Sequence, residues 1–262
     1  GIGKTRLSVE TASRAVDTFR NGTAFVPLAS VNDTAFIVSA IAEAIQFNLQ
    51  GDADPRKQLL HHLRQKNYLL ILDNFEQFLS ASSTGKDRGG EELISEMLEA
   101  APQLKLVITS RERLQIQEEW VFDVQGMAFP QESAIPETEA QKLGDYPAIQ
   151  LFIQRAQKAK SNFEISNEDL SAVIRICQLV GGMPLGIELA APWVRLMSCR
   201  EIADEMERNF DLLETTLRNV PERHRSMRAI LEQTWEQLSE DEQSALSKLS
   251  IFRGGCTREA AE

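Results

Sequence analysis

The chain has 262 residues, a formal net charge of −11, 42% hydrophobic residues and 26% charged residues. This composition is typical of a soluble globular protein, with room for one large domain or for two or three smaller ones. The acidic balance argues against nucleic-acid binding by this chain alone, because such binding depends on cations that neutralise phosphates. No apolar run approaches the ~20 residues that a membrane span needs.

Cysteine and histidine spacing predicts no metal site. The three cysteines are far apart and odd in number, which favours reduced thiols in a cytoplasmic protein. The three histidines build no ligand cluster. These residues are Cys177, Cys199, Cys256, His61, His62 and His224.

The chain opens with Gly1-Ile2-Gly3-Lys4-Thr5, which matches the second half of the phosphate-binding pattern G-x-x-x-x-G-K-[ST]. Glycines let backbone N–H groups turn toward phosphate oxygens, and the following helix directs its positive dipole end at the same charge. Lys4 would reach the β- and γ-phosphates, and the Thr5 hydroxyl would hold Mg²⁺. The alternative is a Gly-rich turn before an ordinary helix, and half a motif does not decide between them.

The first glycine of the pattern would precede residue 1. We therefore expect the chain to be a piece of a longer protein, lacking that glycine and the strand before the loop.

The first half of the chain alternates helices with short apolar runs. Apolar spacing and capping residues predict helices over 4–19, from Asp33 or Thr34 to Ile45, from Pro55 to Lys66, and over 91–100. Strands are predicted at 22–29, 68–72 and 104–108, with a further one at 120–124. Continuous apolar strands between helices indicate a parallel sheet covered on both faces, an α/β fold. Polar stretches at 80–90 and 131–144 interrupt the pattern.

The second half is predicted to be helical. Ser166 with Asp169, and Ser239 with Glu242, have the spacing of capping boxes at helix starts. Gly181-Gly182 would end one helix, and Pro184 would open the next at its first turn.

Two predicted strands end in residues suited to a nucleotide site. Asp73 follows the run Tyr68–Leu72, and Thr109-Ser110-Arg111 follows the run ending at Ile108. In doubly wound folds, ligands bind beyond the carboxyl ends of the strands. Asp73 would order the Mg²⁺ shell opposite Thr5, or it is an ordinary strand-end turn residue. Arg111 is either a γ-phosphate sensor or a surface arginine.

The ordered segments GIGKT, YLLILDNFE, LVITSRERL, QLVGGMPLGIELAAPWVR and VPERHRSMRAI resemble the STAND class of P-loop ATPases, relatives of the NB-ARC and NACHT modules. Within that class, the chain is most similar to the ATPase module of bacterial regulators of the LuxR and AfsR types. The resemblance implies a P-loop nucleotide-binding α/β domain (1–130), a helical domain (145–215) and the truncated start of a winged-helix domain (220–262).

The resemblance also implies roles for individual residues. ATP or ADP would bind along the P-loop and near the GMPL segment, Mg²⁺ would lie between Thr5 and Asp73, and Arg111 would be the sensor arginine. Pro184 would pack on adenine. The implied nucleotide-binding residues are Gly1, Ile2, Gly3, Lys4, Thr5, Arg6, Pro184 and Leu185.

The sequence departs from the family pattern after Asp73. Asn74 stands where many relatives carry a second acidic residue, which predicts slow hydrolysis, and Glu76 is the nearest alternative carboxylate for activating water. A basic stretch near residue 220 favours a solvated or interdomain face over a DNA contact. It comprises Arg218, Arg223, His224, Arg225 and Arg228.

Three functions follow as hypotheses. The leading one is an ATP/ADP-dependent regulatory switch in a transcriptional regulator, contacting nucleic acid only through a domain outside this chain and forming a nucleotide-dependent homo-oligomer. The second is a continuously cycling AAA-type motor or a kinase, and the third is a scaffold that binds no nucleotide. GTP is disfavoured as the ligand, because the sequence contains no N-K-x-D element to recognise guanine.

Overall fold

The protein folds into an α/β unit and a helical unit. The computed structural model describes residues 1–51, 53–79, 89–130, 145–209, 213, 226–228, 232, 235 and 238–252. The α/β unit is Gly3–Val124, and the helical unit comprises Gly1–Ile2 and Gln125–Glu262.

A parallel sheet of three strands forms the centre of the α/β unit, in the order β1-β2-β3. The strands are β1 (Thr23–Pro27), β2 (Leu69–Asp73) and β3 (Lys105–Thr109). All five residues of β2 are buried, because β2 is hydrogen-bonded on both edges and covered on both faces. This burial accounts for its continuous apolar sequence and confirms the predicted α/β fold.

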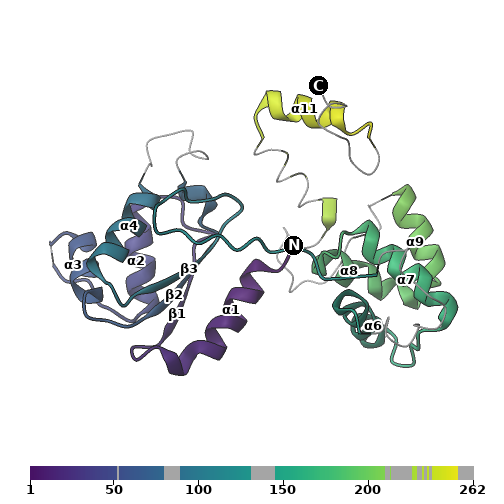
Figure 1. Cartoon of the computed structure of the whole chain (residues 1–262), viewed down its shortest axis with the longest axis horizontal. Helices are drawn as coiled ribbons and strands as arrows, with labels where there is room; N and C mark the ends of the chain where they lie inside the picture. Colours follow the sequence, from purple (N-terminus) through teal and green to yellow (C-terminus); the bar gives the residue numbers. More distant parts are fainter. Residues whose placement is uncertain are drawn as a thin grey trace. The chain divides into compact units, whose positions relative to one another are not determined.

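Helices cover both faces of the sheet (Figure 1). Because side chains alternate along a strand, Leu69 and Ile71 of β2 pack with Ala12 on one face, whereas Leu70 and Leu72 join the larger core on the other. The first face is covered by α1 (Lys4–Ala15), which continues as the 3₁₀ turn η1 (Val16–Thr18). The second is covered by α2 (Ala35–Ala44), α3 (Pro55–Leu63) and α4 (Gly90–Ala100).

The predicted strand at Trp120–Val124 is wrong. These residues are described, and they belong to no strand. Trp120 is 97% exposed and Phe122 is 78% exposed. A strand requires a neighbour that shares its hydrogen bonds, and none of the three described strands pairs with this segment. The strand expected ahead of the phosphate loop stays a prediction.

Most of the described helical unit packs around one apolar core, to which its last helix contributes no buried residue. Both capping boxes predicted for it are present, at Ser166 with Asp169 and at Ser239 with Glu242. The described elements are α6 (Pro147–Ala159), α7 (Asn167–Leu179), α8 (Pro184–Ala190), η5 (Ala191–Arg195), α9 (Cys199–Arg208) and α11 (Glu240–Leu249).

The division between the two units falls after Val124, six residues before the predicted boundary at 130. Met127 and Phe129 pack against the core of the helical unit, and the Met127 N–H donates to the Gly182 carbonyl at 2.8 Å. The segment after Val124 therefore belongs to the helical unit. The predicted domains 145–215 and 220–262 stay predictions, because much of the second lies outside the described residues.

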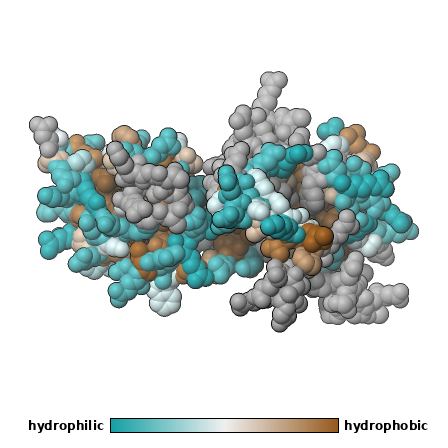
Figure 2. Space-filling model, turned by 90° about the horizontal axis from the view of Figure 1, so that it is seen from above, coloured by the Kyte–Doolittle hydropathy of each residue, from teal (hydrophilic) through white to brown (hydrophobic). Residues whose placement is uncertain are grey.

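The face of the molecule in Figure 2 is mostly hydrophilic, with apolar residues scattered among polar ones. Across the part of the chain that the structure describes, no helix is both long and apolar enough to cross a bilayer.

Candidate functional site

The amino end of α1 has the backbone that a phosphate loop requires. Gly3 precedes the helix with φ 93° and ψ 16°, in the left-handed region that glycine adopts without strain. No acidic residue occupies the first turn of α1, whereas Lys4 and Arg6 lie there. The N–H groups at a helix amino end and the positive end of the helix dipole act together in favour of an anion.

Asp73 lies near the amino end of α1, because side chains alternate between the two faces along β2. It lies on the face that Leu69 and Ile71 share, which is the face covered by α1. Only 4% of Asp73 is exposed, and its Oδ1 accepts a hydrogen bond from the Thr5 hydroxyl at 2.7 Å. The structure thus joins the two residues that the sequence proposed for Mg²⁺.

Thr109 completes this cluster; the sequence placed it at a strand end beside Asp73 but predicted no role for it in the site. The register pairs Asp73 with Thr109 at the ends of their strands. The Thr109 hydroxyl donates to Asp73 Oδ1 at 2.6 Å and accepts the Asn74 N–H at 3.1 Å. Two hydroxyls therefore donate to one carboxylate oxygen. A polar residue closing the strand beside Asp73 was the signal available in the sequence.

Glu76 and Arg111 form an ion pair next to this cluster. Glu76 lies in the 3₁₀ turn η2 (Phe75–Phe78), which follows Asn74, and Asn74 has φ 65°. The distance from Arg111 Nε to Glu76 Oε1 is 3.5 Å, and the Asn74 side-chain amide lies 3.4 Å from the same oxygen. Arg111 is two residues beyond Thr109, so the pair lies at the carboxyl ends of β2 and β3.

The oxygen atoms around Asp73 suit Mg²⁺, which prefers carboxylate, hydroxyl and water oxygens in an octahedral shell. Thr5 and Asp73 supply a hydroxyl and a carboxylate whose oxygens are 2.7 Å apart. Mg²⁺ is usually held by one or two protein oxygens together with phosphates and waters, so this pair fits an ion bound with a nucleotide. No group of three or more His, Cys, Asp or Glu residues suited to a metal occurs among the described residues.

The other predicted nucleotide-binding residues lie in the helical unit. Gly181 and Gly182 end α7 with φ of 57° and 66°, and Pro184 is the first residue of α8, as the sequence predicted. The Leu185 N–H donates to the Gly1 carbonyl at 3.4 Å, and Gly1 is grouped with Ile2 in this unit. A Cβ at Gly1 would lie 2.4 Å from the Leu185 Cβ, so this approach needs glycine.

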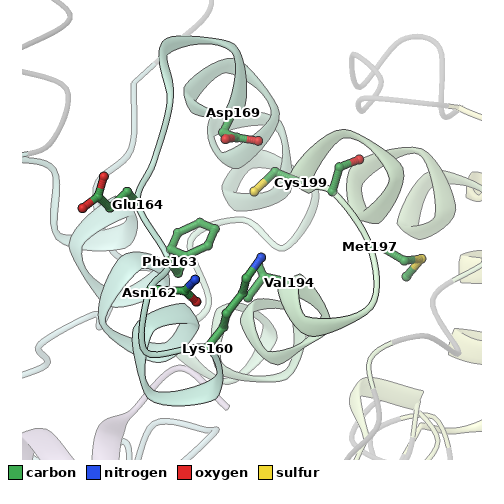
Figure 3. Close-up of a pocket in the computed structure, with 9 residues that line it drawn as sticks. Lys160, Asn162, Phe163, Glu164, Asp169, Val194, Met197 and Cys199 are labelled. Carbon is green, nitrogen blue, oxygen red and sulfur yellow. The ribbon is translucent and has the colours of Figure 1, made fainter.

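A cavity of about 230 Å³ opens in the helical unit, apart from these residues. Figure 3 shows the Asp169 and Cys199 side chains close together at one side, with Lys160 extending from the end of α6. Burial, reinforced by the Asp169 carboxylate, raises the pKa of the Cys199 thiol to about 12. A protonated thiol is a poor nucleophile and a poor metal ligand, which favours a structural role for Cys199.

Most of the basic stretch near residue 220 lies outside the described residues. Arg228 is described, and its Nε lies 3.0 Å from Glu232 Oε1. Cys256 and His224 also lie outside the described part of the chain.

Comparison with known proteins gives relatives in mycobacteria. A Mycobacterium tuberculosis protein named provisionally as an HTH-type transcriptional regulator is 32% identical over 255 residues, which cover 97% of this chain and 26% of that protein. Its Mycobacterium bovis counterpart matches equally. An uncharacterized protein of Mycobacterium tuberculosis is 25% identical over 262 residues, 100% of this chain and 61% of its own length. The chain thus spans about a quarter of the first relatives it matches.

No protein-family model matches the chain. Among solved structures, the Aeropyrum pernix ORC2 protein in ADPNP–ADP complexes is similar, with a TM-score of 0.44 and 18% sequence identity. The match covers 81% of this chain and 57% of that one.

Proposed function

We propose that this chain is the ATP- and ADP-binding switch module of a STAND-class P-loop ATPase, within a cytoplasmic transcriptional regulator. The observation that carries the proposal is the cluster at the amino end of α1, where Thr5 and Thr109 both donate to Asp73. A buried carboxylate between two hydroxyls, beside a helix terminus without acidic residues, suits a nucleotide held with Mg²⁺. The relatives named as HTH-type regulators support the regulatory context.

Each residue at the strand ends then has a separate task. The N–H groups after Gly3 and the Lys4 ammonium would bind phosphate oxygens, while Thr5 and Asp73 would hold the metal ion. Mg²⁺, when bound, would neutralise charge on the β- and γ-phosphates. Arg111, beyond the end of β3, would contact the γ-phosphate, which ADP lacks. Pro184 of the helical unit would offer a flat apolar surface to adenine.

Such a protein acts as a switch only if its two states differ in affinity for the nucleotide, because a ligand shifts an equilibrium by its differential affinity alone. We propose that ADP favours a closed state and ATP an open, self-associating one. DNA would be contacted through a domain outside this chain, since the net charge of −11 opposes a direct contact.

The binding claim is tested by Lys4→Ala in the full-length protein. The variant should lose the nucleotide that the wild type retains through purification, measured by chromatography of the denatured protein. Lys57→Ala is the matched control, because Lys57 is an exposed lysine on α3. If Lys4→Ala keeps the wild-type nucleotide content, the proposal is wrong.

Slow hydrolysis separates the switch from a motor. The two carboxylates near the strand ends are both engaged, Asp73 by two hydroxyls and Glu76 by Arg111 and the Asn74 amide. Asn74 cannot accept a proton from water, so single-turnover cleavage should be slow in the wild type and faster in Asn74→Asp. Rapid wild-type turnover without an inducer would favour the AAA-type motor instead.

A further inference from the structure

Glu76 is held rigidly at the end of β2 by its neighbours in the chain. Asn74 has left-handed backbone angles, and η2 begins at the next residue. The aromatic residues on either side of Glu76 in this turn, Phe75 and Phe78, are 0% and 2% exposed. The side chain of Glu76 is 15% exposed. Two buried anchors therefore fix the direction in which this carboxylate leaves the turn.

The carboxylate of Glu76 meets the Nε edge of the Arg111 guanidinium. Its Oε1 lies 3.5 Å from Arg111 Nε and 3.4 Å from Asn74 Nδ2. Arg111 follows β3, whose last residue, Thr109, bonds to Asp73. The ion pair thus bridges the segments after two adjacent strands, beside the cluster proposed to hold the metal ion.

We propose that Glu76 is a positioning residue for Arg111, and that it sets the preference of the site for ATP over ADP. This inference rests on the proposed function. An arginine side chain loses much rotamer freedom when it is ordered, so a carboxylate that already holds the guanidinium by its Nε edge lowers the cost of ordering it on a phosphate. Only ATP carries the γ-phosphate that Arg111 would contact. Glu76 therefore strengthens ATP binding and leaves ADP binding unchanged.

A role for Glu76 as the general base leads to different results. A base needs a lone pair directed at the attacking water; because Glu76 Oε1 faces two donors, its second carboxylate oxygen would have to take that proton. Loss of a base slows cleavage of bound ATP and leaves the ratio of the two affinities intact. Loss of a positioning residue lowers that ratio even when no cleavage is possible.

The test uses the full-length protein and two ligands, Mg²⁺ with ADP and Mg²⁺ with the non-hydrolysable analogue AMP-PNP, titrated by calorimetry. Glu76→Ala should lower the AMP-PNP-over-ADP affinity ratio about threefold to tenfold, a modest loss because Arg111 is one-third exposed. Glu76→Gln, which keeps the shape of the side chain, should give a smaller loss in the same direction. Glu99→Gln on α4 is the matched control, because Glu99 is exposed and should leave the ratio unchanged.

Coupling to Arg111 completes the test. In the background of Arg111→Gln, Glu76→Ala should cause no further loss of the ratio, because residues that act through one contact are not additive. Equal weakening of both ligands, an unchanged ratio, or losses that add to those of Arg111→Gln would each overturn the inference while leaving nucleotide binding intact. A wild type that binds neither ligand would instead overturn the proposed function, and the inference with it.

Discussion

Replacing Thr109 by valine should weaken the α/β unit and loosen the cluster that Thr109 forms with Asp73 and Thr5. Valine keeps the shape of threonine and removes only the hydroxyl, which donates to Asp73 Oδ1 at 2.6 Å and accepts from the Asn74 N–H at 3.1 Å. Thr109 and Asp73 are 7% and 4% exposed, so water replaces these bonds poorly. A hydrogen bond to a charged group contributes about 1.5–3 kcal/mol, and a neutral one about 1 kcal/mol. The expected loss is therefore about 2.5–4 kcal/mol.

Hydrogen exchange followed by mass spectrometry measures this loss of stability for the α/β unit separately, because peptides from β2 and β3 report on that unit alone. These peptides should exchange faster in Thr109→Val, while peptides from α6 and α7 should not change. Thr109→Ser, which keeps the hydroxyl, is the matched control. If the valine and serine variants exchange alike, the hydroxyl contributes little and the reasoning from these two distances is refuted.

The remaining predictions concern the helical unit. Arg175 binds Glu207 of α9 and thereby lowers the pKa of that carboxyl. The stability that Arg175→Met removes should therefore be fully present above pH 4.5 and should fade as the pH falls through the lowered pKa. In thermal melts from pH 7 to pH 3, the melting temperatures of the wild type and the variant should converge, and a constant difference would contradict this. Cys199, with a pKa near 12, should resist iodoacetamide at pH 8.5 in the native protein and react after unfolding, measured by peptide mapping. Gly126→Ala would place a Cβ 2.1 Å from the Gly181 carbonyl oxygen. The backbone must then shift, which should weaken the neighbouring hydrogen bond from the Met127 N–H to the Gly182 carbonyl and speed hydrogen exchange at Met127. Unchanged exchange at Met127 would contradict this close approach.

Some features of the protein followed from the sequence because they depend on local chemistry. The continuous apolar run before Asp73 predicted a buried central strand, and the structure has one. Ser166 and Ser239 predicted helix starts, since a capping box needs only residues three apart. The left-handed glycines before Pro184 likewise follow from a local backbone requirement.

The pairing of Thr5 with Asp73 was also predictable, although these residues are 68 positions apart. A phosphate loop opens a helix, parallel strands end at one edge, and alternation decides which face each side chain takes. These three rules, applied in turn, bring the hydroxyl to the carboxylate without any knowledge of the packing.

The other contacts of the site were decided by the tertiary structure, because these contacts depend on which strands are neighbours and on the register between them. The sequence placed Thr109 at a strand end, but only the register of β3 against β2 puts its hydroxyl on Asp73. The ion pair of Glu76 with Arg111 joins segments after two strands, and no local pattern encodes that distance. Trp120–Val124 shows the converse, since its composition suits a strand but no described strand lies beside it to supply hydrogen bonds.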